Sequence, residues 1–377
     1  MNKVVLLVRN VAPEKFGGGE MYQILLAEEL KKNGFCPVIL TNSCELLRRA
    51  EENEIEALRP PYIENQNWSG WRNILLPKYI LWQKRLKKWY RNTYKKYKPC
   101  VVNLQSRDDL IAGTLVAKSV GAKVLWTDHA DFKNWVLWNV NVPLKNMIGR
   151  KIIKLSRLAE KVIFVSEGVE RETKRMVAPK KMHNTVVIQN GVQDRKEEYR
   201  NIVPKKDSFV FIGRVVKGKG VDELLKAFDE VKRNYPNTIL NIYGEGELME
   251  ERGNVNMCGS TNDQFKALAE NEVFVLPSYQ EGLSLSLLEA AMMGKKIIAT
   301  NVDGNLEVIK NEETGILVPP KNVEKLADAM EWIMEHKKAS DEMAKKVRRK
   351  YEEEFDFGKI FAKKMLPLYN REKETEK

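Results

Sequence analysis

The sequence predicts an α/β fold in which two doubly wound, Rossmann-like domains face each other across a cleft. Three observations lead to this prediction. At 377 residues, the chain exceeds the size at which a single hydrophobic core usually stops growing. Short β-branched runs alternate with helical patterns, as in a parallel sheet covered by helices. The alternation restarts after a polar stretch from Gln193 to Asp207, where we expect the chain to pass between domains.

The expected strands fall into two sets. In the first half they are Lys3–Val8, Pro37–Thr41, Val101–Leu104, Lys123–Thr127, Lys161–Ser166 and Thr185–Gln189. In the second half they are Ser208–Ile212, Ile239–Tyr243, Val255–Met257, Val273–Pro277, Lys296–Thr300 and Gly315–Val318. We therefore expect one domain over residues 1–195 and another over residues 196–355. Residues 356–377 should pack back onto the first domain as a closing helix, whose apolar side chains recur at helical spacing: Phe357, Ile360, Phe361 and Met365.

Composition restricts the classes of protein to consider. The four cysteines form no CxxC pair and have no histidine at ligand spacing, which argues against a zinc site or a disulfide framework and favours a reducing cytoplasm. The longest apolar runs, such as Val4–Val8, are far shorter than the ~18 residues of a membrane-spanning helix. We therefore expect neither a membrane anchor nor a leader segment. The net charge of +12 favours a polyanionic partner, which could be nucleic acid, an anionic membrane or a phosphorylated substrate.

Two carboxylates bracket a turn between an expected strand and an expected helix. Glu281 lies in the turn beside Gly282, where free backbone N–H groups can meet an anion or a sugar hydroxyl, and Glu289 lies two turns into the helix. Taken alone, the pair favours two acids on a solvated surface, because isolated charges are usually exposed.

A basic glycine-rich turn follows the first strand of the second domain. Its glycines, Gly213 and Gly220, allow close approach of the backbone, and its cations, Arg214 and Lys219, can grip a diphosphate. A basic surface turn explains so short a motif equally well. Gly244 begins a further Gly-x-Gly turn, but the third glycine of a dinucleotide fingerprint is absent, so a hydride-transfer function is excluded.

The first domain holds two further candidates. A glycine-rich turn, Gly17–Gly19, follows the first strand and precedes a helix that reaches about Lys32. His129 follows the strand ending at Thr127, and histidine is rare in this chain. A single histidine is more often structural than catalytic, so this position alone leaves both roles open.

Glu281, seven residues and Glu289 resemble the E-x7-E motif of retaining GT-B glycosyltransferases of family 4, also called glycosyl transferases group 1, and the resemblance covers nearly the whole chain. The turn around Arg214 and Lys219 is similar to that family's G-R-x4-K-G signature. The resemblance implies that Glu281 contacts the donor sugar, that Glu289 binds the ribose, and that Arg214 and Lys219 neutralise the leaving diphosphate. It implies that His129, and less firmly Asp131, lies beside the sugar and the acceptor.

The same resemblance extends to the rest of the donor site and to the reaction. It implies donor binding by Gly18, Gly19, Asn190, Gly213, Gly244, Gly282, Leu283, Ser284, Leu285 and Glu289. The expected reaction moves a hexose or N-acetylhexosamine, with retention, from a nucleoside diphosphate such as UDP to a lipid-linked or membrane-associated glycan. The first domain would hold the acceptor and the second the nucleotide sugar. No D-x-D motif occurs, so no metal and no cofactor besides the donor are expected.

Two departures from the family pattern, Asp303 and Ser284, leave the identity of the donor sugar open. Two alternative functions also remain: a GT-B-like epimerase or phosphorylase, and a membrane-binding relative without catalysis. The intact residues Glu281, Arg214 and Lys219 argue against the second of these.

A basic aromatic segment has two interpretations. Residues 65–107 contain no Asp or Glu, and aromatic residues including Trp82 and Trp89 recur at helical spacing. The segment could lie on an anionic membrane at the inner face, with contacts from Lys84, Arg85, Lys87, Lys88, Trp82 and Trp89. The aromatic stripe could equally be ordinary core. Nucleic acid is not an expected partner, because no RRM, KH, zinc-finger or basic-zipper pattern accompanies the charge.

Overall fold

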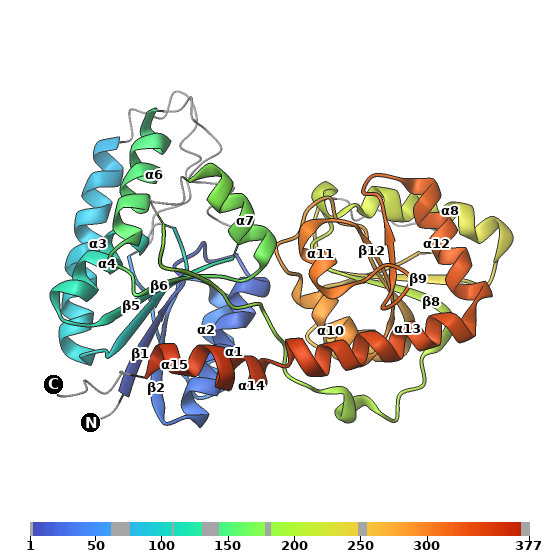
Figure 1. Cartoon of the computed structure of the whole chain (residues 1–377), viewed down its shortest axis with the longest axis horizontal. Helices are drawn as coiled ribbons and strands as arrows, with labels where there is room; N and C mark the ends of the chain where they lie inside the picture. Colours follow the sequence, from blue (N-terminus) through green and yellow to red (C-terminus); the bar gives the residue numbers. More distant parts are fainter. Residues whose placement is uncertain are drawn as a thin grey trace. The chain divides into compact units, whose positions relative to one another are not determined.

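The computed structural model describes residues 3–61, 76–107, 109–129, 143–177, 182–247 and 255–370. Its contacts divide the chain into two compact units (Figure 1). Unit 1 comprises residues 1–189 and 361–377, and unit 2 comprises residues 190–360. The division differs from the expected boundary at residue 195 because Asn190 donates a hydrogen bond to Leu283 O, and Asp194 pairs with Arg348, both in unit 2.

In the described part of unit 1, seven parallel strands form one sheet in the order β3-β2-β1-β4-β5-β6-β7. The strands are β1 Lys3–Val8, β2 Phe35–Leu40, β3 Glu56–Leu58, β4 Val101–Leu104, β5 Lys123–Asp128, β6 Lys161–Phe164 and β7 Thr185–Val187. The helices between them are α1 Gly18–Lys32, α2 Cys44–Glu52, α3 Leu76–Tyr97, α4 Asp109–Ser119, α6 Pro143–Ser156 and α7 Glu167–Met176. Figure 1 shows α3, α4 and α6 together on one face of this sheet and α1 and α2 on the other.

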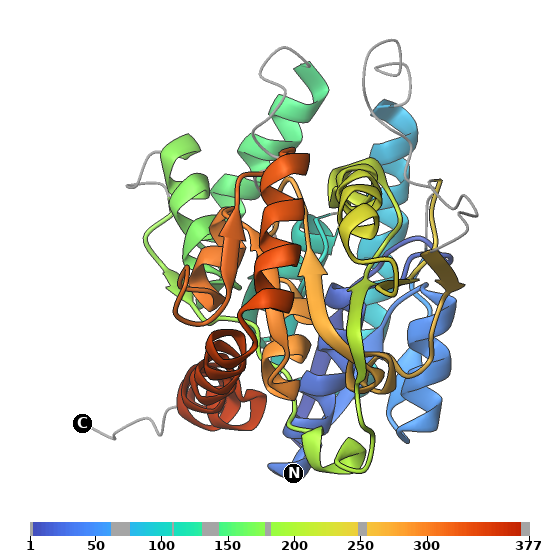
Figure 2. The same cartoon turned by 90° about the vertical axis from the view of Figure 1, so that its right-hand side faces the viewer.

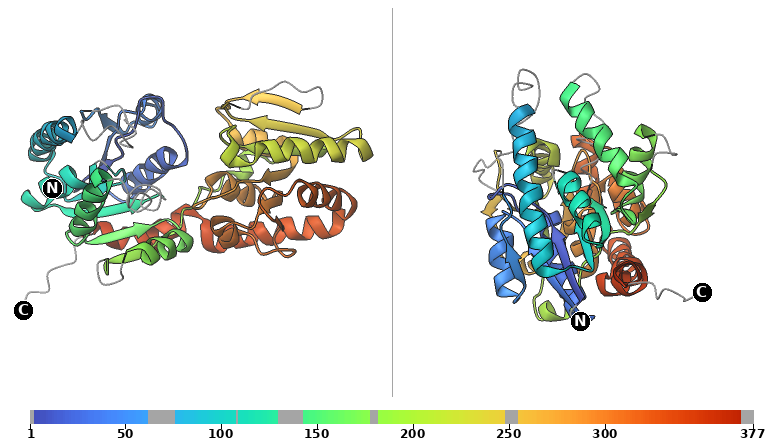
Figure 3. Two further views of the ribbon diagram at one scale, coloured as in Figure 1. Left: turned by 90° about the horizontal axis from the view of Figure 1, so that it is seen from above. Right: turned by 90° about the vertical axis from the view of Figure 1, so that its left-hand side faces the viewer.

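The described part of unit 2 holds a six-stranded parallel sheet in the order β10-β9-β8-β11-β12-β13. The strands are β8 Lys205–Ile212, β9 Ile239–Tyr243, β10 Val255–Gly259, β11 Asn271–Leu276, β12 Lys296–Thr300 and β13 Ile316–Val318. The helices are α8 Val221–Asn234, α9 Gln264–Glu270, α10 Leu285–Met293, α11 Asp303–Val308, α12 Val323–Glu335 and α13 Lys337–Lys350. Helix α8 packs on α12, and α10 packs on α9 and α13, so that both faces of the sheet are covered (Figures 2 and 3).

Burial on both faces explains why the central strands are continuous apolar runs rather than alternating ones. In β1, the residues from Val5 to Val8 are all fully buried, and Val273–Leu276 in β11 are almost so. The expected strands are all confirmed, with small shifts at their ends. The short edge strand β3 was not predicted.

The C-terminal segment is helical, as predicted. A π-helical turn, Tyr351–Phe355, is followed by α14 Phe357–Ile360, a second π-helical turn Phe361–Met365 and α15 Leu366–Tyr369. All four apolar side chains that indicated a helix here are buried. The last part packs in unit 1, where the Tyr22 hydroxyl lies 3.5 Å from Met365 Sδ and Asn103 Nδ2 lies 2.7 Å from the Tyr369 hydroxyl.

Helix α3 decides between the two interpretations of the aromatic stripe. Tyr79, Trp82, Leu86, Tyr90 and Tyr94 are buried in the core of unit 1, and Trp89 packs against it. Trp82 is therefore not a surface residue, and its assignment to a membrane surface is wrong, because a helix that covers a sheet must bury one face. Among the described residues, every helix is too short or too polar to span a bilayer.

The opposite face of α3 is basic and exposed. Lys84, Arg85 and Lys88 are exposed and Lys87 is half-buried. Ile80 and Leu81 lie on the same face and expose about half of their surface. The predicted charge is therefore on the surface, whereas Trp82 lies in the core and Trp89 is half-buried.

Candidate functional site

The strand order of unit 2 places two of the predicted motifs side by side. From β8 the chain builds outward through β9 and β10, then returns to β11 on the other side of β8. Ligands of such sheets bind at this reversal, outside the carboxyl ends of the two strands. The turn with Arg214 and Lys219 follows β8, and the loop with Glu281 follows β11. The two motifs therefore lie at the same edge of the sheet, at the strand reversal.

An ion pair joins the two loops. Lys219 Nζ lies 2.6 Å from Glu281 Oε1, and the side chains are 21% and 9% exposed. A backbone hydrogen bond from Tyr279 N to Gly218 O, 3.0 Å long, supports the same contact. The structure thus brings together a cation and a carboxylate that lie 62 residues apart in the sequence.

Arg214 lies in the same turn and is exposed. Within the described ranges, its guanidinium has neither a hydrogen-bond acceptor nor an ion-pair partner. Its charge is thus available to an anion at this edge of the sheet, and guanidinium groups bind phosphate oxygens through paired N–H donors.

Glu289 lies inside the unit rather than on its surface. It is the fifth residue of α10, slightly more than one turn from the helix start rather than the expected two turns. The helix begins at Leu285, because Ser284 caps it by accepting a hydrogen bond from Leu287 N. Gln264 Nε2 donates to Glu289 Oε1 at 3.2 Å. Burial raises the pKa of Glu289 to about 7, and Gln264 and Arg195 offset only part of this effect. A buried carboxyl that titrates near neutrality is typical of functional sites.

Several glycines let the loops of this edge pack backbone against backbone. A Cβ atom on Gly220, which has φ +69°, would lie 2.0 Å from Pro277 O. One on Gly244 would lie 1.8 Å from Gly213 O, and one on Gly304 would lie 2.2 Å from Gly282 O. These contacts require glycine, so a close approach of chain segments accounts for them without a ligand.

The remaining donor candidates of unit 2 support the loop after β11. Asn190 Nδ2 donates to Leu283 O at 3.3 Å, and both residues are buried. Ser284 is the N-cap and Leu285 the first residue of α10. These residues therefore support the loop that carries Glu281 and the start of α10.

Unit 1 reverses its strand order between β1 and β4, and a polar network lies at that point. Arg9 follows β1, and Gln105 follows β4. Arg9 Nε donates to Glu20 Oε1 at 2.7 Å, and Arg9 Nη1 donates to Gln105 O at 3.0 Å. A Cβ atom on Gly19 would lie 2.3 Å from Arg9 Nη2, so the predicted glycine turn lies directly over this guanidinium.

His129 joins the same network. Its Nε2 lies 2.8 Å from Gln105 Oε1, and its ring meets the Tyr22 ring edge-on with centroids 5.0 Å apart. Burial, followed by the charges of Arg9 and Lys15, holds the pKa of His129 well below its usual range. The imidazole is therefore neutral at physiological pH, its Nε2–H donates to Gln105 Oε1, and Nδ1 is left as an acceptor. Asp131 lies outside the described residues.

Sequence reasoning missed Arg9, Gln23 and Gln105, which belong to no recognised motif. Each is buried, and Gln23 Nε2 donates to Gln105 Oε1. One signal could have found two of them, because Arg9 and Gln105 are polar residues directly after apolar strands. Gly18 begins α1, which extends to Lys32 as predicted.

Two family models together match most of the chain. The family model described as glycosyl transferases group 1 matches residues 192–350, and that of Glycosyltransferase Family 4 matches residues 16–196. The glycogen synthase of Mycobacterium tuberculosis is 26% identical over 220 residues, which are 55% of this chain and 53% of that protein. An N,N'-diacetylbacillosaminyl-diphospho-undecaprenol alpha-1,3-N-acetylgalactosaminyltransferase of Campylobacter jejuni is 28% identical over 252 residues, or 60% and 65% of the two chains. The match therefore spans less than two thirds of either relative.

A solved structure matches over nearly the whole chain. HepE of Anabaena, crystallised with UDP and glucose, superposes with a TM-score of 0.76 at 17% identity and covers 98% of this chain and 100% of its own. At this identity the likeness shows the fold alone, which is the GT-B type with two parallel-sheet α/β domains.

Proposed function

Because the chain belongs to the glycosyl transferases group 1 and family 4, we propose that it transfers a sugar from a nucleoside diphosphate to an acceptor hydroxyl. The observation that carries the proposal is the Lys219–Glu281 ion pair at the strand reversal of unit 2, in the same turn as Arg214, which has no ion-pair partner among the described residues. Cations for a diphosphate and a carboxylate for sugar hydroxyls meet there.

The proposed donor is a UDP-linked hexose or N-acetylhexosamine. UDP is supported by the UDP and glucose in the HepE crystals. The proposed acceptor is a lipid-linked or membrane-associated glycan, which is supported by the name of the Campylobacter relative, a transferase acting on a diphospho-undecaprenol-linked sugar.

In the proposed reaction, the bond between the anomeric carbon and the diphosphate oxygen breaks while the acceptor oxygen bonds to the same face of that carbon. The acceptor proton passes to the departing phosphate oxygen, so configuration is retained and no protein nucleophile is used. Arg214 and Lys219 stabilise the negative charge that develops on the diphosphate. Loss of such a contact typically costs ~2.7 to 4 kcal/mol in the transition state. Two side-chain cations take the place of a metal ion in this scheme.

The carboxylates position the donor. Glu281 accepts hydrogen bonds from hydroxyls of the sugar, and its pairing with Lys219 fixes its orientation before the donor arrives. Glu289 accepts hydrogen bonds from the ribose, which favour its ionised form, so nucleotide binding at neutral pH releases a proton from a carboxyl with a pKa of about 7. Neutral His129 provides one hydrogen bond to the sugar or the acceptor.

We also propose that the outer face of α3 contacts an anionic membrane at the cytoplasmic side. Lys84, Arg85 and Lys88 supply the charge, and the half-exposed Ile80 and Leu81 lie among them on the same face. Each basic residue near an anionic surface contributes about 1 kcal/mol. A protein held there would meet lipid-linked acceptors.

The test is a donor panel with the intact protein and lipid-linked acceptors. UDP sugars should support transfer, and NMR of the anomeric proton should show the configuration of the donor in the product. Arg214→Ala should lower turnover ~100- to 1000-fold, whereas Arg233→Ala, an exposed arginine at the end of α8, should not. Arg214 is a better probe than Lys219, whose removal also leaves Glu281 unpaired.

Three results would contradict the proposal. Full turnover of Arg214→Ala with saturating donor would remove the diphosphate role. An inverted product would exclude the retaining mechanism. Epimerisation of the donor, or phosphorolysis without an acceptor, would favour the alternative enzyme classes.

A further inference from the structure

A pocket of about 420 Å³ lies in unit 2 at the edge of the sheet opposite the strand carboxyl ends. Three of its residues lie just before the start of a strand. Pro204 precedes β8, Ala269 precedes β11 by two residues, and Lys295 precedes β12. The motifs around Arg214 and Glu281 follow strands, so they lie at the other edge. The pocket is therefore separate from the proposed donor site.

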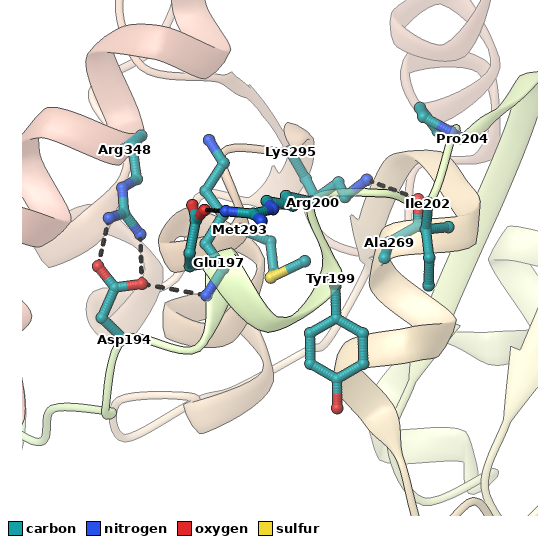
Figure 4. Close-up of a pocket in the computed structure, with 11 residues that line it drawn as sticks. Asp194, Glu197, Tyr199, Arg200, Ile202, Pro204, Ala269, Met293, Lys295 and Arg348 are labelled. Carbon is teal, nitrogen blue, oxygen red and sulfur yellow. Dashed lines mark hydrogen bonds and ion pairs between the residues drawn. The ribbon is translucent and has the colours of Figure 1, made fainter.

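Positive charge exceeds negative charge in the lining. Four cations, Lys196, Arg200, Lys295 and Arg348, face two acids, Asp194 and Glu197, an excess of two positive charges. The acids are already paired, since Arg348 binds Asp194 and Arg200 binds Glu197 (Figure 4). Among the described residues, neither Lys196 nor Lys295 forms an ion pair with an acid of the lining, although the charge of Asp194 also acts on Lys196.

Lys295 is a buried cation held by carbonyl groups. It is 8% exposed, and its Nζ donates to Asn271 O at 2.7 Å and Ala269 O at 3.3 Å. An ammonium group has three donors, so one remains for another acceptor. Burial, followed by the charge of Lys196, lowers the pKa of Lys295 to about 8.

Lys196 approaches from the segment that enters unit 2. Its Nζ lies 3.1 Å from the position that a Cβ atom on Gly294 would take. Gly294 is the residue before Lys295 in the chain. Within the described part of the chain, this ammonium has neither a hydrogen-bond acceptor nor an ion-pair partner. Burial, followed by the charge of Arg348, lowers the pKa of Lys196. The charge of Lys196 disfavours the charged form of Lys295, and an anion bound by both ammonium groups would relieve that repulsion.

Apart from Tyr199, the remaining side chains of the lining are apolar. In Figure 4, the Arg348–Asp194 pair lies at one end of the lining, and Ile202, Pro204 and Ala269 lie at the other. A phosphate monoester carries about −1.5 to −2 charges at neutral pH, which matches the excess of two cations. An organic group attached to the phosphate would meet the apolar end.

We propose that this pocket binds a small phosphate ester, with its phosphate between Lys196 and Lys295 and its organic part against Ile202 and Pro204. The alternative role of the cations is to neutralise the carboxyl-terminal ends of α9 and α10, where Lys295 and Arg348 bind carbonyl oxygens. That role requires no ligand, so binding measurements distinguish the two.

The experiment is isothermal titration calorimetry of the intact protein at pH 7 and constant ionic strength in chloride. Inorganic phosphate and glycerol 3-phosphate are the probes, and the ester should bind more tightly because it also contacts the apolar end. Lys196→Gln should bind the ester about tenfold more weakly, the usual loss for one charge-assisted hydrogen bond. Lys196→Arg should retain binding. Lys226→Gln, an exposed lysine on α8, is the matched control and should bind like the wild type.

Arg214→Ala separates this pocket from the proposed donor site and should leave ester binding unchanged. Each of four results would overturn the proposal: no heat of binding with either probe, equal affinity of the ester and inorganic phosphate, unchanged binding by Lys196→Gln, or loss of binding in Arg214→Ala. The melting temperature of each variant without ligand shows that it is folded.

Discussion

Replacement of Glu289 with glutamine should stabilise the protein at neutral pH and weaken donor binding. Glu289 is buried, and its pKa is raised from 4.5 to about 7 by that burial. Glutamine has the same shape, carries no charge and can still accept the hydrogen bond from Gln264. The substitution therefore removes the cost of burying a carboxylate but also removes the charge that would hold the ribose hydroxyls.

The magnitude follows from the pKa difference between the folded and the unfolded chain. Between pH 4.5 and 7, the folded protein keeps the proton on Glu289 and the unfolded chain has lost it. The stability contributed by this group is therefore complete below pH 4.5, falls as the pH rises and is gone above about pH 7. A pKa raised from 4.5 to about 7 corresponds to a loss of about 3 kcal/mol in the free energy of unfolding above neutral pH. The free energy of unfolding of Glu289→Gln should lack this pH dependence.

Urea unfolding of the wild type and of Glu289→Gln at pH 5 and pH 8 measures the effect. The free energies of unfolding should differ little at pH 5, and the variant should be about 3 kcal/mol more stable at pH 8. Glu230→Gln, which alters an exposed acid on α8, is the control and should follow the wild type at both values. Calorimetry should show weaker UDP binding by Glu289→Gln alone. Parallel pH profiles of the wild type and Glu289→Gln would refute the argument from burial.

Three further predictions concern the loops, the absence of a metal and the membrane surface. Gly220→Ala should destabilise the protein by at least about 1 to 2 kcal/mol, which is the cost of a left-handed conformation for alanine. The cost should be larger because the added Cβ would also lie 2.0 Å from Pro277 O. Unchanged urea unfolding would contradict this. Transfer should continue in EDTA, and activity that is lost there and restored by magnesium or manganese would exclude the metal-free scheme. Replacement of three basic residues of α3 with glutamine should reduce co-sedimentation with anionic vesicles, as should 1 M salt, where the Debye length is ~3 Å. The residues to change are Lys84, Arg85 and Lys88, and the matched control changes the exposed Lys338, Lys346 and Arg349 of α13. Equal sedimentation of the two variants would leave the α3 charges as a solvated face.

The fold was largely predictable because the sheets are parallel and buried on both faces. Strands such as Lys3–Val8 and Lys296–Thr300 contain unbroken, buried apolar runs between helical patterns, and their predicted bounds agree with the structure. Strand β3 escaped prediction because Glu56–Leu58 is three residues long, begins with a charge and lies at the sheet edge. Periodicity cannot identify so short a segment.

Helix α3 shows a limit of a different kind. A stripe of aromatic residues at helical spacing appears both in a helix that covers a sheet and in one that lies on a membrane. Trp82 fits either pattern, and only the packing of α3 against α4 and the core decides between them. The charges of Lys84 and Arg85 were easier to place, because a lysine or arginine without a partner is rarely buried.

In the candidate site, the motifs identify the residues, whereas the tertiary structure decides which of them meet. Arg214, Lys219 and Glu281 could be identified because they stand at fixed spacings next to glycines. The contact between Lys219 and Glu281 depends on the strand order, since β8 and β11 are neighbours only after the chain has built β9 and β10. The same reasoning applies to Arg9 and Gln105 in unit 1. Each is a polar residue at the end of an apolar strand, and strands β1 and β4 become neighbours at the reversal of that sheet. Had the strand order been inferred first, the rule that ligands bind at such reversals would have identified both residues before any motif was considered.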